Sequence, residues 1–250
     1  MLVAASCECF PDLSLGDALE KLADLQFTSI ELDIHEQGGH LKPSEIHANL
    51  EQAINSCRAT RRLTVCSLSV DIQAEGDLYY EQFASICKLA KAIKVVSITV
   101  PAGELGTPFN EEVERLQKLC NIASLESVLV GVKTETDRIS QDPDTIKVLC
   151  DNVKGLGVTL DPSHFVFGPL KGGDYDHILK YVYHVQLRDT TKDSLQVRVG
   201  QGEIDYGRLV SQLIKEKYSR ALSINMQPID DADHMAEMRK MRLLLESLLL

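Results

Sequence analysis

The chain has 250 residues, 44% of them hydrophobic, and a formal net charge of −11. No apolar run reaches the ~20 residues of a membrane-spanning helix, and no basic n-region of a signal peptide precedes the first apolar stretch, so we expect a soluble protein without a targeting segment. The acidic balance and the lack of a basic cluster argue against a nucleic-acid surface. A small molecule is therefore the expected partner.

The seven cysteines are scattered along the chain. Their number is odd, and their spacing matches neither a disulfide framework nor a zinc-binding CxxC pair. This usage is typical of a reducing compartment and predicts a cytoplasmic protein.

Apolar stretches of strand length alternate with segments of helical periodicity along the whole chain. The expected strands cover residues 2–6, 29–35, 63–70, 95–100, 128–135, 155–161, 182–188 and 221–226. Eight strand-helix units in one chain of this length predict a single domain over residues 1–250 that forms a closed (β/α)8 TIM barrel. An open doubly wound sheet is the alternative, but that fold usually has a Gly-rich loop after its first strand, where this chain has Cys-Glu-Cys-Phe.

Capping residues predict where several of the helices begin. Ser14 opens the first helix, and Pro43 lies near the start of a second helix whose apolar stripe continues to Cys57. Asn110 can cap the helix after the fourth strand. Asp142, followed by Pro143, is a strong start signal for the sixth helix, and Asp205 can cap the seventh.

The stretch Gly155-Leu156-Gly157-Val158-Thr159-Leu160-Asp161-Pro162-Ser163-His164 resembles a buried parallel strand that ends abruptly in polar residues. In parallel barrels the chemistry lies where the strands end, so Asp161 and His164 are the first candidates for a site. The alternative interpretation is that Asp161 only turns the chain before Pro162.

Other expected strands also carry polar side chains toward their C-terminal ends, on faces set by the period of two. These are Glu31 and Asp33, Lys133 and Glu135, His184, Gln186 and Arg188, and Ser223, Asn225 and Gln227. Barrel interiors are usually filled by apolar residues, so such a set predicts a functional site at one rim. Two structural alternatives remain: Lys133 pairs with Glu135 or Asp161 as a buried ion pair, or His184 is a satisfied core histidine.

Four of these segments together resemble the xylose isomerase-like TIM barrels, which include sugar and sugar-phosphate isomerases, epimerases and inosose dehydratases. The segments are Val132-Lys133-Thr134-Glu135-Thr136, Gly157 to His164, Tyr183 to Asp189, and Gly200-Gln201-Gly202-Glu203-Ile204-Asp205. The resemblance implies that Glu135 and Asp161 are metal ligands and that His164 lies beside the substrate. The last segment lies where barrels commonly bind phosphate, so a phosphorylated substrate would contact it.

The chain departs from the family pattern at two positions. Gln186 stands where the family has a metal-binding His, and Asn225 stands where it has a metal-binding Glu. The implied metal set is thus Glu135, Asp161, Gln186 and Asn225, which should bind Mg²⁺ or Mn²⁺ weakly or not at all. We expect the ammonium group of Lys133, within about 4 Å of the two carboxylates, to take the electrostatic role of the ion.

These features favour a sugar or polyol isomerase or epimerase that works by proton transfer. Its catalytic residues would be Glu135, Lys133 and His164. Its substrate-binding residues would be Glu31, His184, Arg188, Gln186 and Asn225. Three alternatives remain open: a dehydratase, a Schiff-base lyase that uses Lys133, and a non-catalytic barrel that binds a carbohydrate or a partner protein. The apolar C-terminal residues 243–250 predict a helix that packs on the barrel or faces a second subunit in a homo-oligomer.

Overall fold

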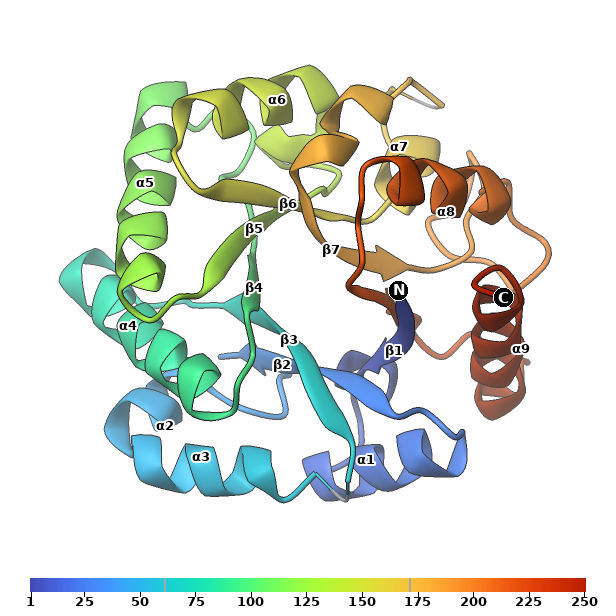
Figure 1. The fold of residues 1–250 in the computed structure, drawn as a ribbon, viewed down its shortest axis with the longest axis horizontal. Helices are drawn as coiled ribbons and strands as arrows, with labels where there is room; N and C mark the ends of the chain where they lie inside the picture. The colour runs from blue at the N-terminus through green and yellow to red at the C-terminus, as the bar shows by residue number, and fades with distance from the viewer. Residues whose placement is uncertain (61, 171) are drawn as a thin grey trace.

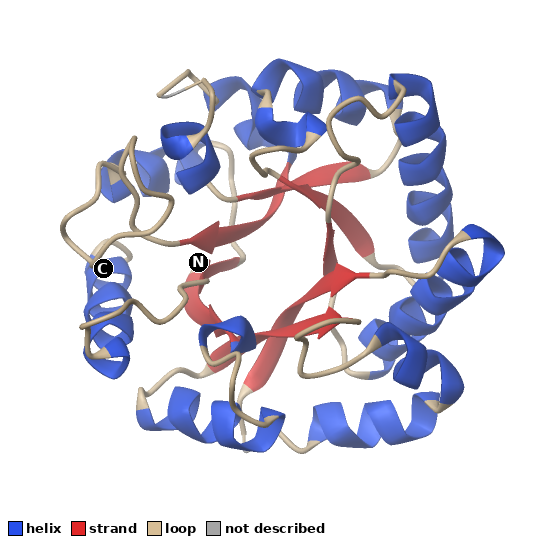
Figure 2. Cartoon of the chain, turned by 180° about the vertical axis from the view of Figure 1, so that it is seen from behind, coloured by secondary structure: helices blue, strands red, loops and turns tan. Residues whose placement is uncertain are grey.

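The structure of the protein is a computed structural model that describes residues 1–60, 62–170 and 172–250. In these residues, parallel strands close into a barrel in the order β1-β2-β3-β4-β5-β6-β7-β8. Helices surround the barrel on the outside (Figure 1). Figure 2 shows the same arrangement from behind, with the strands inside the ring of helices. The predicted TIM barrel is confirmed, and the open-sheet alternative is wrong.

The strand bounds agree closely with the expected ones. The strands are β1 (Leu2–Ser6), β2 (Ser29–His35), β3 (Thr64–Asp71), β4 (Ser97–Val100), β5 (Leu129–Lys133), β6 (Leu156–Leu160), β7 (Val182–Leu187) and β8 (Ala221–Ile224). The α-helices are α1 (Leu15–Asp24), α2 (Pro43–Ala48), α3 (Leu50–Arg58), α4 (Gly76–Ala92), α5 (Phe109–Leu125), α6 (Pro143–Asn152), α7 (Ser163–Phe167), α8 (Tyr206–Lys215) and α9 (His234–Ser247). Short 3-10 helices are η1 (Cys7–Cys9), η2 (Ile139–Gln141) and η3 (Asp176–Tyr181).

Three predicted caps are present, and each satisfies backbone N–H groups that a helix start leaves without partners. The Ser14 side chain accepts a hydrogen bond from the N–H of Asp17 at the start of α1. Asp142 accepts from Asp144 and Thr145 at the start of α6.

Asp205 accepts from the N–H of Arg208 at the start of α8, as predicted. Two other predictions about helices were wrong. Asn110 lies inside α5, which begins directly after Pro108. The single helix expected after Pro43 is divided in two at Asn49, whose side chain accepts from the N–H of Gln52 and caps α3. An Asn side chain that binds its own backbone competes with the helix, so it ends one helix and starts the next.

The barrel interior contains a polar contact between β4 and β6, unlike the apolar filling typical of this fold. The hydroxyl oxygens of Thr99 on β4 and Thr159 on β6 lie 2.8 Å apart across the interior. A Cβ atom at Gly131 on β5 would lie 2.7 Å from the same Thr159 hydroxyl, so the glycine makes room for this contact. Because side chains alternate along a strand, Lys133 and Asp161 follow these inward positions toward the mouth.

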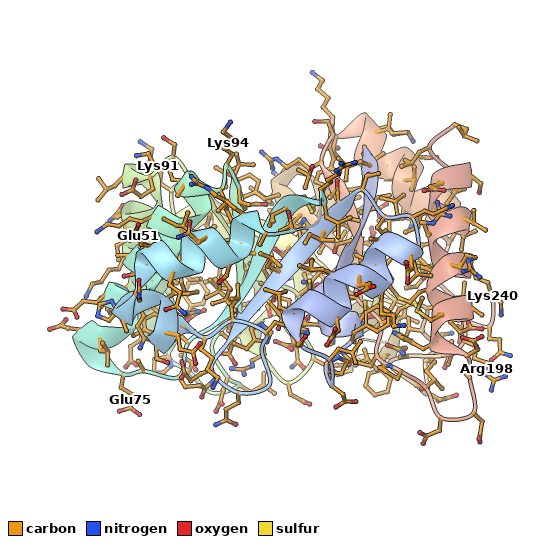
Figure 3. All side chains as sticks on the ribbon, turned by 90° about the horizontal axis from the view of Figure 1, so that it is seen from below. Glu51, Glu75, Lys91, Lys94, Arg198 and Lys240 are labelled. Carbon is orange, nitrogen blue, oxygen red and sulfur yellow. The ribbon has the colours of Figure 1, made fainter. Side chains whose placement is uncertain are left out.

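Many charged side chains extend from the outer helices. Figure 3 shows Glu51 on α3, Lys91 on α4 and Lys240 on α9 extending from the outer helices. In the part of the chain that the structure describes, no helix combines the length and apolar character needed to span a membrane.

Candidate functional site

The four positions that the family resemblance singled out lie at the same end of four neighbouring strands. Glu135 follows β5, Asp161 follows β6 directly, Gln186 lies near the end of β7, and Asn225 follows β8 directly. Strand β5 ends at Lys133, two residues earlier than expected, so Glu135 belongs to the loop after the strand. This is the C-terminal mouth of the barrel, where TIM-barrel enzymes carry their active sites.

The two amide side chains are held by carboxylates. Nε2 of Gln186 donates to Oε1 of Glu31 at 2.6 Å, and Nδ2 of Asn225 donates to Oε2 of Glu8 at 2.6 Å. A carboxylate only accepts hydrogen bonds, so these contacts identify the amide nitrogens and turn the amide oxygens the other way. Both amides therefore present an oxygen away from the carboxylate that holds them.

Asp161 is fully buried and pairs with Arg188. Its Oδ1 accepts from the N–H and the hydroxyl of Ser163 at 3.1 and 2.5 Å, and its Oδ2 lies 3.1 Å from Nη2 of Arg188. Burial by itself raises the pKa of the Asp161 carboxyl, but the charges of Arg188, His164 and Lys133 lower it more, so the net pKa lies below the ordinary value. The carboxylate is ionised at neutral pH.

The expected ion pair of Lys133 is absent from the described residues. Its ammonium group has no carboxylate within 4.0 Å, and Arg188 is the cation beside Asp161 instead. The sequence-based assignment of this contact to Lys133 was wrong because Arg188 is long enough to extend from β7 to the end of the adjacent β6. Lys133 is half-buried and without a hydrogen-bond partner in the described part of the protein.

Glu31 and His184 form a buried pair beneath the mouth. Nε2 of His184 lies 2.9 Å from Oε2 of Glu31, and the two side chains are 2% and 0% exposed. Burial by itself raises the pKa of Glu31, but the charge and hydrogen bond of His184 together with Ser223 and Gln186 lower it more, so the net pKa lies below the ordinary value. The structure thus favours the interpretation of His184 as a satisfied core histidine, and it gives Glu31 the role of holding Gln186.

His164 is fixed as a neutral hydrogen-bond donor. Its Nδ1 accepts from the backbone N–H of Thr136 at 3.0 Å, so the ring proton resides on Nε2, which lies 3.7 Å from Oδ2 of Asp161. Burial lowers the pKa of His164, and the charge of Asp161 only partly offsets this effect. At neutral pH the ring is uncharged, and its Nε2–H is on the side of Asp161.

A small cavity of about 170 Å³ opens at the mouth, and Lys133, Glu135 and Arg138 are among its lining residues. The Glu135 side chain is 29% exposed, and its Oε2 lies 3.9 Å from Nε of Arg138. This volume is below the roughly 300–1,000 Å³ of pockets for drug-sized ligands, so the cavity suits a small molecule. A larger cavity of about 420 Å³ lies beside α2 and α3, but there Lys42 and Glu45 pair with each other at the surface.

Sequence reasoning assigned no role to three residues of the mouth: Glu8, His35 and Arg138. Oε1 of Glu8 lies 3.3 Å from Nδ1 of His35, and its Oε2 holds Asn225. Glu8 lies two residues after β1, and His35 is the last residue of β2. The strand-end position that made Glu135 a candidate therefore applies to both of them. Arg138 stands three residues after Glu135 in a loop. A loop has no regular periodicity, so the sequence does not indicate which way the Arg138 side chain points.

The segment from Gly200 to Asp205 lies beside β7, but the backbone N–H groups of its first four residues already have acceptors within the protein. The N–H groups of Gly200 and Gly202 donate to Oδ2 of Asp189 at 2.7 and 3.0 Å. An internal carboxylate thus occupies the place where the sequence suggested a phosphate, and the structure does not support that hypothesis.

Replacement of Gly202 by Ala is expected to destabilise the protein by about 2–4 kcal/mol. The new Cβ would lie 1.8 Å from Oδ1 of Asp189 and 2.8 Å from the N of Thr190, so the loop must give up its hydrogen bonds to the carboxylate. Urea denaturation measures the loss. Gly207→Ala is the matched control, since its Cβ would meet nothing closer than 3.5 Å in helix α8. Equal stability of the two variants would show that Asp189 can move without cost.

Asp33 anchors the loop between β2 and α2. Its carboxylate accepts from the backbone N–H of His40 at 2.8 Å and contacts Nδ1 of the same ring at 2.7 Å. Burial by itself lowers the pKa of His40, but the hydrogen bond and charge of Asp33 raise it more, so the net pKa lies above the ordinary value of 6.5. The opposite holds for Asp33, whose net pKa is lowered despite its burial. The two side chains form a buried ion pair that closes the loop.

This pair predicts a pH window for stability. Because the folded-state pKa of His40 is raised, its stabilisation is fully present below pH 6.5 and is lost as the pH rises through the folded-state pKa. We expect His40→Gln to cost about 1–3 kcal/mol at pH 6 and clearly less at pH 9, measured by urea denaturation. His47→Gln, at a half-exposed histidine on α2, is the control and should cost little at either pH. A pH-independent cost for His40→Gln would contradict the assignment.

At the four family positions, two carboxylates stand beside guanidinium groups and the other two side chains are amides. An ion on Oδ2 of Asp161 would lie next to the guanidinium of Arg188, which is 3.1 Å from that oxygen, and Glu135 faces Arg138. Two of the four donors are neutral amides. Among the residues that the structure describes, no group of three or more His, Cys, Asp or Glu side chains is arranged to hold a metal ion.

A family model described as xylose isomerase-like TIM barrel matches residues 19–244. No curated protein sequence matches the chain. Among solved structures, a D-tagatose 3-epimerase-like protein has 16% identity and a TM-score of 0.77, with 100% of this chain and 97% of that chain covered. The probable 3-DHS dehydratase AsbF from Bacillus anthracis has 13% identity and a TM-score of 0.74, with 98% and 99% covered. The IOLI protein with a bound zinc atom has 15% identity and a TM-score of 0.72, with 100% and 96% covered.

Proposed function

Since the chain belongs to the xylose isomerase-like TIM barrel family, we propose that it is an enzyme that isomerises a small sugar or polyol by proton transfer. The observation that carries the proposal is the mouth cavity, in which Glu135 and Lys133 face the same small space. The similar solved structures include an epimerase-like protein and a probable dehydratase, which agrees with chemistry on a polyhydroxylated substrate.

Glu135 is the base in this proposal. Its carboxylate is partly exposed to the cavity and only loosely paired with Arg138, so it can approach a carbon next to a carbonyl and take its proton. Negative charge then develops on the carbonyl oxygen. Lys133 and the Nε2–H of His164 are the donors that can stabilise it, because one is an unpaired cation and the other a fixed neutral donor.

A single base favours isomerisation over epimerisation. Asn225 replaces the second carboxylate of the family pattern, and an amide takes no proton at neutral pH. Glu135 can return the proton to the neighbouring carbon on the same face. A second proton passes from the hydroxyl on the first carbon to the former carbonyl oxygen, and the carbonyl has then moved by one position. Inversion at the original carbon needs a second group on the opposite face, and the four family positions do not supply one.

The test is an exchange assay with the purified protein. D-Fructose, D-tagatose, D-psicose and L-ribulose are each incubated with the protein in D2O, and proton NMR follows deuterium incorporation and new sugar signals. An isomerase introduces deuterium next to the carbonyl and forms an aldose. Tight binding without exchange would instead support the non-catalytic barrel, and loss of water from the substrate would support the dehydratase.

The lack of a partner for Lys133 favours one second candidate, a Schiff-base lyase. An amine without an ion pair can attack a carbonyl, lose water and form an imine, provided that it is deprotonated. Reduction of a protein–ketose mixture with borohydride would fix such an imine as a secondary amine, and mass spectrometry would find the added mass on Lys133. An unmodified lysine would exclude this candidate for the sugars tested.

A further inference from the structure

Three polar side chains from the first three strands line one side of the mouth cavity. Glu8 follows β1, His35 ends β2 and Ser69 lies on β3, and all three border the cavity of about 170 Å³. The side chains of Glu8 and His35 are each 20% exposed, and Ser69 is 5% exposed. These groups therefore border the space that a small molecule would occupy.

The three side chains form one continuous line of contacts. Nδ1 of His35 lies 3.3 Å from Oε1 of Glu8, and Nε2 of the same ring lies 3.2 Å from the hydroxyl oxygen of Ser69. A carboxylate only accepts hydrogen bonds, so Glu8 favours the tautomer of neutral His35 that carries its proton on Nδ1. Nε2 is then the acceptor, and the hydroxyl of Ser69 is its donor.

The barrel positions each member of this line. Ser69 on β3 is paired with Asp33 on β2, and His35 is two residues further along β2, so its side chain extends to the same face as that of Asp33. On the other side, Oε2 of Glu8 accepts a hydrogen bond from Nδ2 of Asn225 at 2.6 Å, which leaves Oε1 for His35. Asn225 therefore positions Glu8, and Glu8 positions the imidazole ring.

A hydroxyl, an imidazole and a carboxylate in this order match a nucleophile–base–acid triad. A serine hydroxyl by itself is a weak nucleophile, because its proton must leave as its oxygen attacks. A neutral imidazole at hydrogen-bond distance takes that proton, and the carboxylate stabilises the imidazolium that forms. The ring nitrogens are used as such a triad requires, with Nε2 toward Ser69 and Nδ1 toward Glu8.

A second set of the same residue types on the outer helices lacks these features. Nδ1 of His47 lies 3.0 Å from the hydroxyl oxygen of Ser85, and Nε2 of His47 lies 4.0 Å from Oε2 of Glu81. The Ser85 hydroxyl donates to the backbone carbonyl of Glu81 at 3.1 Å, so its proton is not directed to the imidazole. None of these three residues is among those that line the mouth cavity. Ser85 is therefore a matched control for Ser69.

We propose that Ser69, His35 and Glu8 cleave small carboxylic esters. Oγ of Ser69 attacks the ester carbonyl carbon while Nε2 of His35 takes the hydroxyl proton. The bond from the carbonyl carbon to the alcohol oxygen then breaks, and His35 returns the proton to the leaving alcohol. Water attacks the acyl-serine by the same route, which releases the carboxylic acid and restores the hydroxyl.

The surroundings of the triad define the substrate further. Lys133 borders the same cavity, and its positive charge stabilises the oxyanion that forms on the carbonyl oxygen. The small volume restricts the acyl group to a short chain, while the leaving alcohol can remain outside the cavity. The reaction does not use Glu135 as a base, so failure of this proposal leaves the proposed isomerase standing.

Methanesulfonyl fluoride tests the nucleophile, because it is small and transfers its sulfonyl group to an activated serine as fluoride leaves. The purified protein is incubated with the reagent, and peptide mass spectrometry locates the added group. Ser69 should be labelled, and in His35→Gln its labelling should be at least about 100-fold slower. An unlabelled Ser69, labelling of Ser85 at an equal rate, or labelling of Ser69 that is unchanged in His35→Gln would overturn the triad.

p-Nitrophenyl acetate tests the activity, which is followed by the release of nitrophenolate. Ser69→Ala should lower kcat/KM by about 100-fold or more, and Ser85→Ala should stay within about twofold of the parent. Glu8→Gln should lower kcat by at least about 10-fold with little change in KM, as expected of a positioning residue that acts through His35. Absence of turnover by the parent, or turnover that persists in Ser69→Ala, would overturn the proposal.

Discussion

Glu135→Gln is expected to reduce turnover by about 10²- to 10⁴-fold and to leave the barrel folded. The substitution keeps the shape of the side chain but removes the only carboxylate among the proposed catalytic groups. Its stability should change little, because the Glu135 side chain is 29% exposed and its nearest cation, Arg138, is 3.9 Å away. Deuterium exchange into the substrate and urea denaturation measure the two quantities.

Glu104→Gln is a closely matched control for this prediction. Glu104 also lies beside Arg138, at 4.0 Å, but its side chain is 82% exposed and it is not among the residues that line the mouth cavity. The control should keep its turnover within about twofold of the parent. Full activity of Glu135→Gln, or an equal loss in both variants, would show that Glu135 is not the base and that only the environment of Arg138 matters.

Arg188→Met is expected to destabilise the protein by about 3–5 kcal/mol, because it leaves the buried Asp161 carboxylate without its nearest cation. Lys133→Met should cost much less, since no carboxylate lies within 4.0 Å of its ammonium group in the described residues. Urea denaturation at pH 7 compares the two variants, which remove one cation each from the same mouth. An equal loss of stability in both variants would show that Lys133 and Arg188 contribute equally to stabilising the Asp161 carboxylate.

The double variant Asp161→Asn with Arg188→Met separates charge from packing. If the cost of Arg188→Met comes from an uncompensated charge, neutralising Asp161 should recover part of it, about 1–2 kcal/mol. The pH dependence gives an independent check. The folded-state pKa of Asp161 is lowered in the parent, so its stabilisation is present above the ordinary value of 3.8 and is lost as the pH falls through the folded-state pKa. In Arg188→Met this loss should begin at a higher pH.

The sequence by itself determined the barrel, most strand bounds and the rim where the polar residues gather. These features depend on local patterns: apolar runs of strand length, helical periodicity and capping residues such as Asp142, which act over a few neighbouring residues. It also determined that Asp161, Gln186 and Asn225 lie at one end of the barrel, because parallel strands in a closed barrel all end on the same side.

Only the tertiary structure decided which side chains contact one another. Gln186 meets Glu31 across 155 residues of sequence, and Asn225 meets Glu8 across 217. Such contacts depend on the stagger between strands and on the reach of long side chains, which a period of two does not specify. The same reason explains the error on Lys133: alternation placed it near Asp161, but the longer Arg188 on the adjacent strand reaches that carboxylate.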